Sequence, residues 1–333
     1  LPYLPKIKGM DHLEDFKDTE TMKVRPIQMH ALLHLFLSIV FFAGLAVLLS
    51  GVAIAFAAMF ADIPLNSEGM STAMEKINSN STVLKIVGFL SSSLPLLLAC
   101  VFVAYFAKKH IGVEKRHYLL LSKPKGWAWF IYSLLFFAVC VPIILGPLAE
   151  LNEMIDFTRW PRMHEWLIKQ EGASNGTYEA MVGDGGYLSF ILSLIFMALL
   201  PAISEELFFR GVLMNGFNGL FRNMHVSIFL TAIFFSLIHL QFMKAIPMFF
   251  LAVAFGYAAY WTGTIWTSIV AHFINNAFAL YQLYFITDGD YTKAIEEGAN
   301  VPMVVSGILI VLATALFVYI QKNSTTKTEN FYV

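Results

Sequence analysis

Six polar residues in the second half of the chain stand within or beside long apolar runs. They are Glu205, Glu206, Arg210, His239, His272 and Asn276. An ionisable group inside a membrane-spanning helix costs roughly 2.5–3.5 kcal/mol on insertion scales, so it indicates either function or a buried pairing. Carboxylate and imidazole groups can accept and donate protons, which makes acid–base chemistry the first expectation. A purely structural ion pair between helices is the competing interpretation.

The spacing of these residues predicts which side chains face one another. Glu206 and Arg210 are four residues apart and share a helix face, which favours a charge-assisted pair between them. Glu205 is rotated about 100° away from that pair and is free for another task. His272 and Asn276 are also four apart and project together from their helix.

The composition predicts that these residues sit in a membrane protein. The 333 residues are 58% hydrophobic and only 14% charged, whereas a soluble domain is about a quarter charged. We therefore expect an all-α, polytopic transmembrane helical bundle of about eight spanning helices, with an interfacial amphipathic segment. The predicted spans are 31–61, 83–107, 127–148, 187–217, 226–243, 246–261, 265–286 and 302–320.

A shared site requires the polar groups of three helices to lie at one depth. At about 1.5 Å per residue from the predicted span ends, Glu205, His239 and the His272–Asn276 pair agree to within about two turns. The sequence therefore predicts one interior site, somewhat nearer the end of the fourth span at Phe217.

The distribution of Lys and Arg predicts the orientation of the bundle. Basic residues cluster before the first span and after the second, which places both termini in the cytoplasm of a multi-pass protein of the inner or plasma membrane. The predicted segments are a cytoplasmic tail at 1–30, three spans at 31–148, an extracytoplasmic or interfacial insertion at 149–186, a catalytic core at 187–285, and a last span with its tail at 286–333.

The insertion at 149–186 carries Trp160 and Trp166 among charged residues, which predicts a helix lying in the outer membrane interface. The alternative is that this segment gates access to the site. The formal net charge of −1 makes nucleic acid an unexpected partner. The lipid bilayer is the expected surrounding, and the sequence indicates no oligomeric state.

Three ordered motifs carry a resemblance to a known family. They are Glu205-Glu206-x-x-x-Arg210, Phe235-x-x-x-His239 and His272-x-x-x-Asn276. At these motifs the chain resembles the CAAX proteases and bacteriocin-processing enzymes, also called the Abi family, which include the type II CAAX prenyl endopeptidases. The resemblance covers roughly residues 187–285.

The resemblance implies a glutamate-dependent intramembrane endopeptidase. Glu205 and His239 would position and deprotonate a water molecule, and His272 and Asn276 would donate hydrogen bonds to the developing oxyanion. Glu206 would orient the site together with Arg210, or assist directly.

The resemblance leaves the cofactor open, because members of this family have often been described as metalloproteases. A metal-free site is favoured, since the sequence-local HExxH pair of many zinc proteases is absent. The alternative is zinc held by Glu205, His239 and His272.

The substrate and the class of function also remain open at this stage. A lipidated protein with a CaaX-type tail and the leader of a secreted peptide are equally compatible substrates. Two other classes are a non-catalytic membrane immunity or scaffold protein and a proton-coupled transporter that uses Glu205, Glu206 and His239. No pair of broken helices recommends the transporter.

Overall fold

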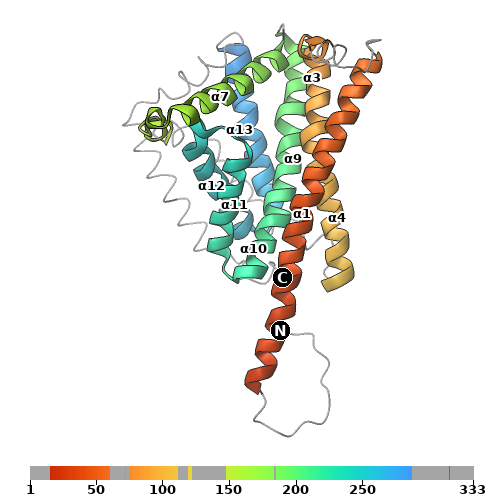
Figure 1. The fold of residues 1–333 in the computed structure, drawn as a ribbon, viewed down its shortest axis with the longest axis vertical. Coiled ribbons are helices and arrows are strands. Elements are labelled where there is room, and N and C mark those ends of the chain that lie inside the picture. The colour runs from red at the N-terminus through yellow and green to blue at the C-terminus, as the bar shows by residue number, and fades with distance from the viewer. Residues whose placement is uncertain are drawn as a thin grey trace.

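The computed structural model describes residues 16–60, 75–111, 119–121, 148–183 and 185–286, with positions 72 and 315. Within these ranges all regular secondary structure is helical, as predicted (Figure 1). The predicted spans at 127–148 and 302–320 lie almost entirely outside the described residues.

Ten α-helices form the body of the molecule within the described residues. They are α1 (Phe16–Phe60), α3 (Ser81–Gly88), α4 (Leu94–Ile111), α7 (Pro161–Val182), α8 (Tyr187–Ser193), α9 (Leu200–Glu206), α10 (Met214–Phe221), α11 (Met224–Ile238), α12 (Ala245–Thr262) and α13 (Ile265–Phe285). π-helical turns join α3 to α4 at Phe89–Ser93, α8 to α9 at Leu194–Leu199, and α9 to α10 at Leu207–Leu213. The first turn joins α3 and α4 into one continuous helical rod. The other two join α8, α9 and α10 into a second rod, Tyr187–Phe221.

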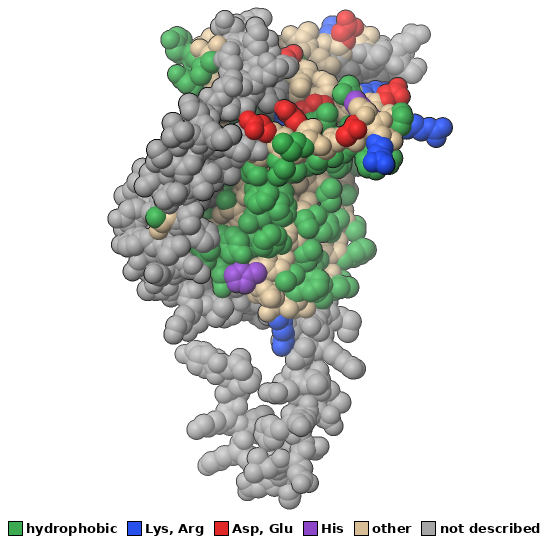
Figure 2. Space-filling view, turned by 90° about the vertical axis from the view of Figure 1, so that its left-hand side faces the viewer, with side chains coloured by type: hydrophobic (Ala, Val, Ile, Leu, Met, Phe, Trp, Pro, Cys, Tyr) green, Lys and Arg blue, Asp and Glu red, His purple; other side chains and the backbone are tan. Residues whose placement is uncertain are grey.

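Four described helical segments are long and apolar enough to cross a membrane. They are Ala31–Phe56, Ser81–Lys108, Tyr187–Phe221 and Phe242–Thr262. Figure 2 shows one face on which an apolar band lies below a rim of acidic and basic side chains. Because exposed apolar side chains need lipid around them, the protein is an integral, multi-pass membrane protein.

Two predicted spans differ in detail from the helices observed. The fifth, expected at 226–243, is the 15-residue helix α11, which ends at Ile238. The first, expected at 31–61, belongs to the longer helix α1, which begins at Phe16 and continues through Gly44 and Gly51 without a break. A glycine weakens a helix without ending it, and tertiary packing overrides that weakness here.

Small residues allow the helices of the core to approach closely. Ala99, Cys100 and Val103 of α4 are almost fully buried and belong to the same apolar cluster as Phe208 and Val212. Small side chains at such contacts increase van der Waals packing between helices in lipid. The cluster fixes the rod Tyr187–Phe221, on which three of the candidate site residues lie.

Helix α7 lies across one end of the bundle (Figure 1). It begins at Pro161, where the missing amide costs nothing, and it ends at Val182, before Gly183 with φ +65°. The helix predicted within 149–186 is therefore present in the structure. It contacts α3, α8 and the short turn Phe242–Lys244.

The close approach of α11 and α12 gives a first testable prediction. A Cβ added to Gly256 would lie 2.8 Å from Cγ2 of the buried, β-branched Ile228. We expect Gly256→Ala to lower stability by about 1–3 kcal/mol, because a stiff side chain in a packed core must move. Thermal unfolding in detergent measures this change.

Gly44→Ala is the matched control, since the added methyl meets nothing within 4 Å and lies in a helix. That variant should be as stable as the parent or slightly more so. Equal melting temperatures for the two variants would contradict the close packing of α11 on α12.

Candidate active site

The rod Tyr187–Phe221 carries Glu205, Glu206 and Arg210 at the junction of α9 with a π-helical turn. Glu205 and Glu206 are the last two residues of α9, and Arg210 lies within the turn Leu207–Leu213. π-helical turns inside α-helices occur frequently at functional sites. The sequence did not predict this turn, because its apolar pattern is that of an ordinary helix.

Glu206 and Arg210 form the ion pair that their spacing predicted. The Nη1 atom of Arg210 donates to Oε1 of Glu206 at 2.7 Å, and both side chains are 0% exposed. The Nη2 atom donates to the carbonyl of Ala252 in α12 at 2.9 Å. Aromatic rings line the guanidinium, with their centroids 5.2–6.0 Å from its carbon: Phe209, Phe235 and Phe255.

His272 of α13 joins this buried pair. Its Nδ1 lies 2.9 Å from Oε1 of Glu206, and its ring stacks on Phe255 at 5.0 Å between centroids. Because a carboxylate paired with Arg210 can only accept, Nδ1 of His272 carries the donated proton. The Nε2 atom then faces Glu205, with 3.8 Å between Nε2 and Oε2.

His239 occupies a different position from the one expected. It caps the end of α11 and does not lie in the middle of a span, and Leu240 after it has a left-handed backbone with φ +53°. Its Nδ1 lies 2.6 Å from the carbonyl of Phe235. Since a carbonyl only accepts, Nδ1 donates there and Nε2 faces Oε2 of Glu205 at 3.7 Å.

The connection that follows His239 contacts α7. Glu205 lies near the middle of the rod Tyr187–Phe221. The depth of the site relative to the two membrane faces stays a prediction. The fifth span had been expected to continue to residue 243, five residues past Ile238, where α11 ends.

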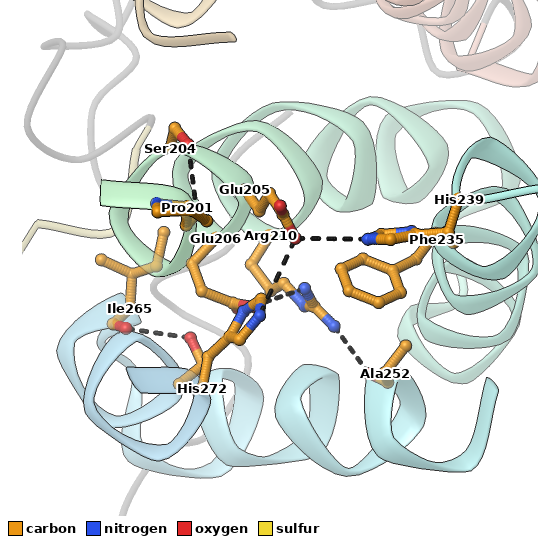
Figure 3. A network of polar contacts seen from close by, with 11 residues as sticks. Pro201, Ser204, Glu205, Glu206, Arg210, Phe235, His239, Ala252, Ile265 and His272 are labelled. Carbon is orange, nitrogen blue, oxygen red and sulfur yellow. Dashed lines mark hydrogen bonds and ion pairs between the residues drawn. The ribbon is translucent and has the colours of Figure 1, made fainter. Parts of the chain in front are cut away.

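Glu205 is the point on which the two imidazoles converge (Figure 3). The distances of 3.7 and 3.8 Å exceed those of hydrogen bonds, and Oε2 of Glu205 has no hydrogen-bond partner among the described residues. The side chains of Glu205 and His239 are 19% and 25% exposed. The site therefore has a completely buried side, formed by Glu206 and Arg210, and a partly exposed side, formed by Glu205 and His239.

The sixth predicted residue, Asn276, lies one turn beyond His272 on α13 and is half-buried. Its Oδ1 accepts a hydrogen bond of 3.3 Å from Nδ2 of Asn275. The structure thus brings five of the six candidates into direct contact or near contact, and it places Asn276 beside them on a shared helix.

The zinc alternative stays a prediction. Zinc takes nitrogen and oxygen ligands at about 2.0–2.2 Å in a tetrahedral arrangement. Its three expected ligands are Glu205, His239 and His272, and the Nε2 atoms of the two imidazoles lie 3.7 and 3.8 Å from Oε2 of Glu205. Within the described ranges, no group of three or more His, Cys, Asp or Glu side chains is arranged as a ready-made metal site.

Two aromatic residues shape the site. Phe235 belongs to the motif Phe235-x-x-x-His239, but the sequence analysis assigned it no role. It supplies the carbonyl for His239, and its ring lies against Arg210 and 5.9 Å from the ring of His272. Sequence reasoning missed Phe255, which is completely buried and lies against both the guanidinium and the imidazole of His272.

Comparisons with known proteins match the part of the chain that carries these residues. Residues 187–278 match the family described as "Type II CAAX prenyl endopeptidase Rce1-like". The chain is also 30% identical over 112 residues to the "Uncharacterized protein YpbD" of Bacillus subtilis (strain 168), which covers 31% of this chain and 54% of that protein. The chain thus spans about half the length of this relative. No solved structure matches.

Proposed function

Residues 187–278 form a domain of the Rce1-like type II CAAX prenyl endopeptidase family, and from this membership we propose that the protein is an intramembrane endopeptidase. All six candidate residues lie within the matched range. The observation that carries the proposal is the convergence of two imidazole Nε2 atoms on one carboxylate oxygen of Glu205. Such a convergence suits the activation of a water molecule.

Glu205 and His239 act on the nucleophile in this proposal. A polar separation of more than 3.5 Å is often bridged by water, which here would hydrogen-bond to Oε2 of Glu205 and Nε2 of His239. The carboxylate takes a proton as the water oxygen bonds to the scissile carbonyl carbon. The same proton passes to the leaving amine when the carbon–nitrogen bond breaks.

His272 and Asn276 stabilise the oxyanion that forms on the carbonyl oxygen. Donors fixed in a site of low dielectric are worth more than donors in water. Because Nδ1 of His272 donates to Glu206, this ring would donate to the oxyanion through Nε2, which requires a proton on both ring nitrogens.

Glu206 and Arg210 orient the site without touching the substrate. Both are completely buried, and Glu206 uses one oxygen for both Arg210 and His272. This contact geometry favours the orienting role over direct assistance by Glu206. The aromatic residues around Arg210 exclude water, which strengthens these interactions.

The substrate is proposed to be a peptide or a lipidated protein tail that is reached within the bilayer. The name of the matched family points to a prenylated CaaX tail, and an unlipidated leader peptide is the second candidate. The experiment is to incubate purified protein with a farnesylated CaaX peptide and with its unlipidated counterpart, followed by mass spectrometry.

We expect cleavage of at least one peptide, at a rate that changes less than about twofold when a chelator is added, because no described group of ligands suits a metal. Preference for the farnesylated peptide would identify the substrate class. Loss of activity on chelation, with recovery on adding zinc, would overturn the metal-free mechanism. Absence of cleavage of both peptides and of a set of leader peptides would overturn the proposed function.

A further inference from the structure

His239 begins a short connection whose backbone conformation is not explained by its own sequence. The connection runs from His239 to Lys244 between α11 and α12, and it contains neither glycine nor proline. Leu240 nevertheless has φ +53°, which costs a residue with a side chain roughly 1–2 kcal/mol. Contacts from elsewhere in the protein must hold this backbone in place.

Asn152 supplies the most extensive of these contacts. Its Nδ2 donates to the carbonyls of Phe242 at 3.2 Å and Met243 at 2.9 Å. Its Oδ1 accepts from the backbone amide of Ile246 at 2.9 Å, and the residue is only 2% exposed. One buried side chain therefore ties together the connection and the first turn of α12.

Two side chains of helix α7 also contact this connection. Nζ of Lys244 lies 2.6 Å from Oε1 of Glu171, and both side chains are mostly buried. Nε2 of Gln241 donates to Oγ of Ser174 at 2.5 Å. These partners belong to residues 148–183, which lie outside the range matched by the family.

From these contacts we propose that Asn152 is a positioning residue for His239, and that residues 148–183 are part of the catalytic apparatus. The proposal rests on the proposed function and deepens it. Nε2 of His239 can bind the same water molecule as Glu205 only if the distance between the two side chains is kept. A displacement of about 1 Å can cost on the order of 100-fold in rate. Residues 148–183 thus act on the reaction through the backbone that carries His239.

The test compares Asn152→Ala and Asn152→Asp with the parent. We expect kcat to fall about 10- to 100-fold while KM changes less than about twofold, because substrate contacts remain and His239 moves away from the water that it orients. The Asp variant keeps an acceptor for Ile246 but places a carboxylate against two carbonyls, so it should not restore kcat.

Asn215→Ala is the matched control for loss of a buried amide. Asn215 is 1% exposed and donates to the carbonyl of Gly211 within its own rod, away from the 239–244 connection. It should lower the melting temperature by a similar amount while kcat stays within about threefold of the parent. An equal fall in kcat for both variants would reduce the role of Asn152 to general stability.

A second measurement does not depend on peptidase activity. In Asn152→Ala, carbethoxylation of His239 by diethylpyrocarbonate and hydrogen exchange of the 239–246 amides should both accelerate several-fold, and neither should change in Asn215→Ala. Unchanged modification and exchange would overturn the positioning proposal even if the parent cleaves peptides. If the parent cleaves nothing, the proposed function fails, and these two rates alone decide whether Asn152 holds His239.

Discussion

Glu205→Gln is expected to lower kcat/KM for peptide cleavage by about 10³-fold or more, with little change in stability. Glutamine has nearly the same shape as glutamate but cannot take a proton from water. The residue is 19% exposed, so the change leaves no new group stranded in the core. Progress curves with the preferred peptide and a melting curve in the same detergent measure both effects.

Glu165→Gln is a suitable control, because Glu165 is an exposed carboxylate on α7 and should tolerate the change without effect. A Glu205→Gln protein that cleaves as fast as the parent would show that another group activates the water. If the variant is inactive on peptides yet complements a deletion strain fully, the biological role is that of a scaffold. Proton-coupled uptake in proteoliposomes that needs Glu205 would favour the transporter hypothesis.

Much of the site geometry followed from local rules. Four residues separate Glu206 from Arg210, and the structure confirms the ion pair that this spacing predicted. The rarity of ionisable groups in apolar runs pointed to His239 and His272, and both lie within 4 Å of Glu205. The chemical roles of these residues remain predictions, since a static arrangement does not show turnover.

The rest depended on contacts between distant parts of the chain. Between Ile238 and Met243 the polar residues His239 and Gln241 alternate with apolar ones, and no glycine or proline indicated that α11 ends before His239. The connection that follows this end is bonded by Asn152, which is about 90 residues earlier in the sequence. The π-helical turn at Leu207–Leu213 was likewise not indicated, because its composition is that of a regular helix.

The largest effect on stability is expected from Arg210→Met. This change removes the guanidinium from between three aromatic rings and leaves the carboxylate of Glu206 buried, with His272 as its remaining partner. Removing one member of a buried ion pair typically costs about 3–5 kcal/mol, because the other charge loses its compensation. We expect a matching loss in the free energy of unfolding, measured by denaturant titration in mixed micelles.

The double variant Glu206→Gln with Arg210→Met separates charge from packing. Glutamine keeps an oxygen that accepts a hydrogen bond from Nδ1 of His272, but it is neutral, so no unpaired charge is left in the core. Most of the lost stability should therefore return, although catalysis should not, because the ion pair that orients His272 is lost. If the double variant is as unstable as the sum of the two single changes, the residues act independently. The buried pair would then not be what holds α9 against α12 and α13.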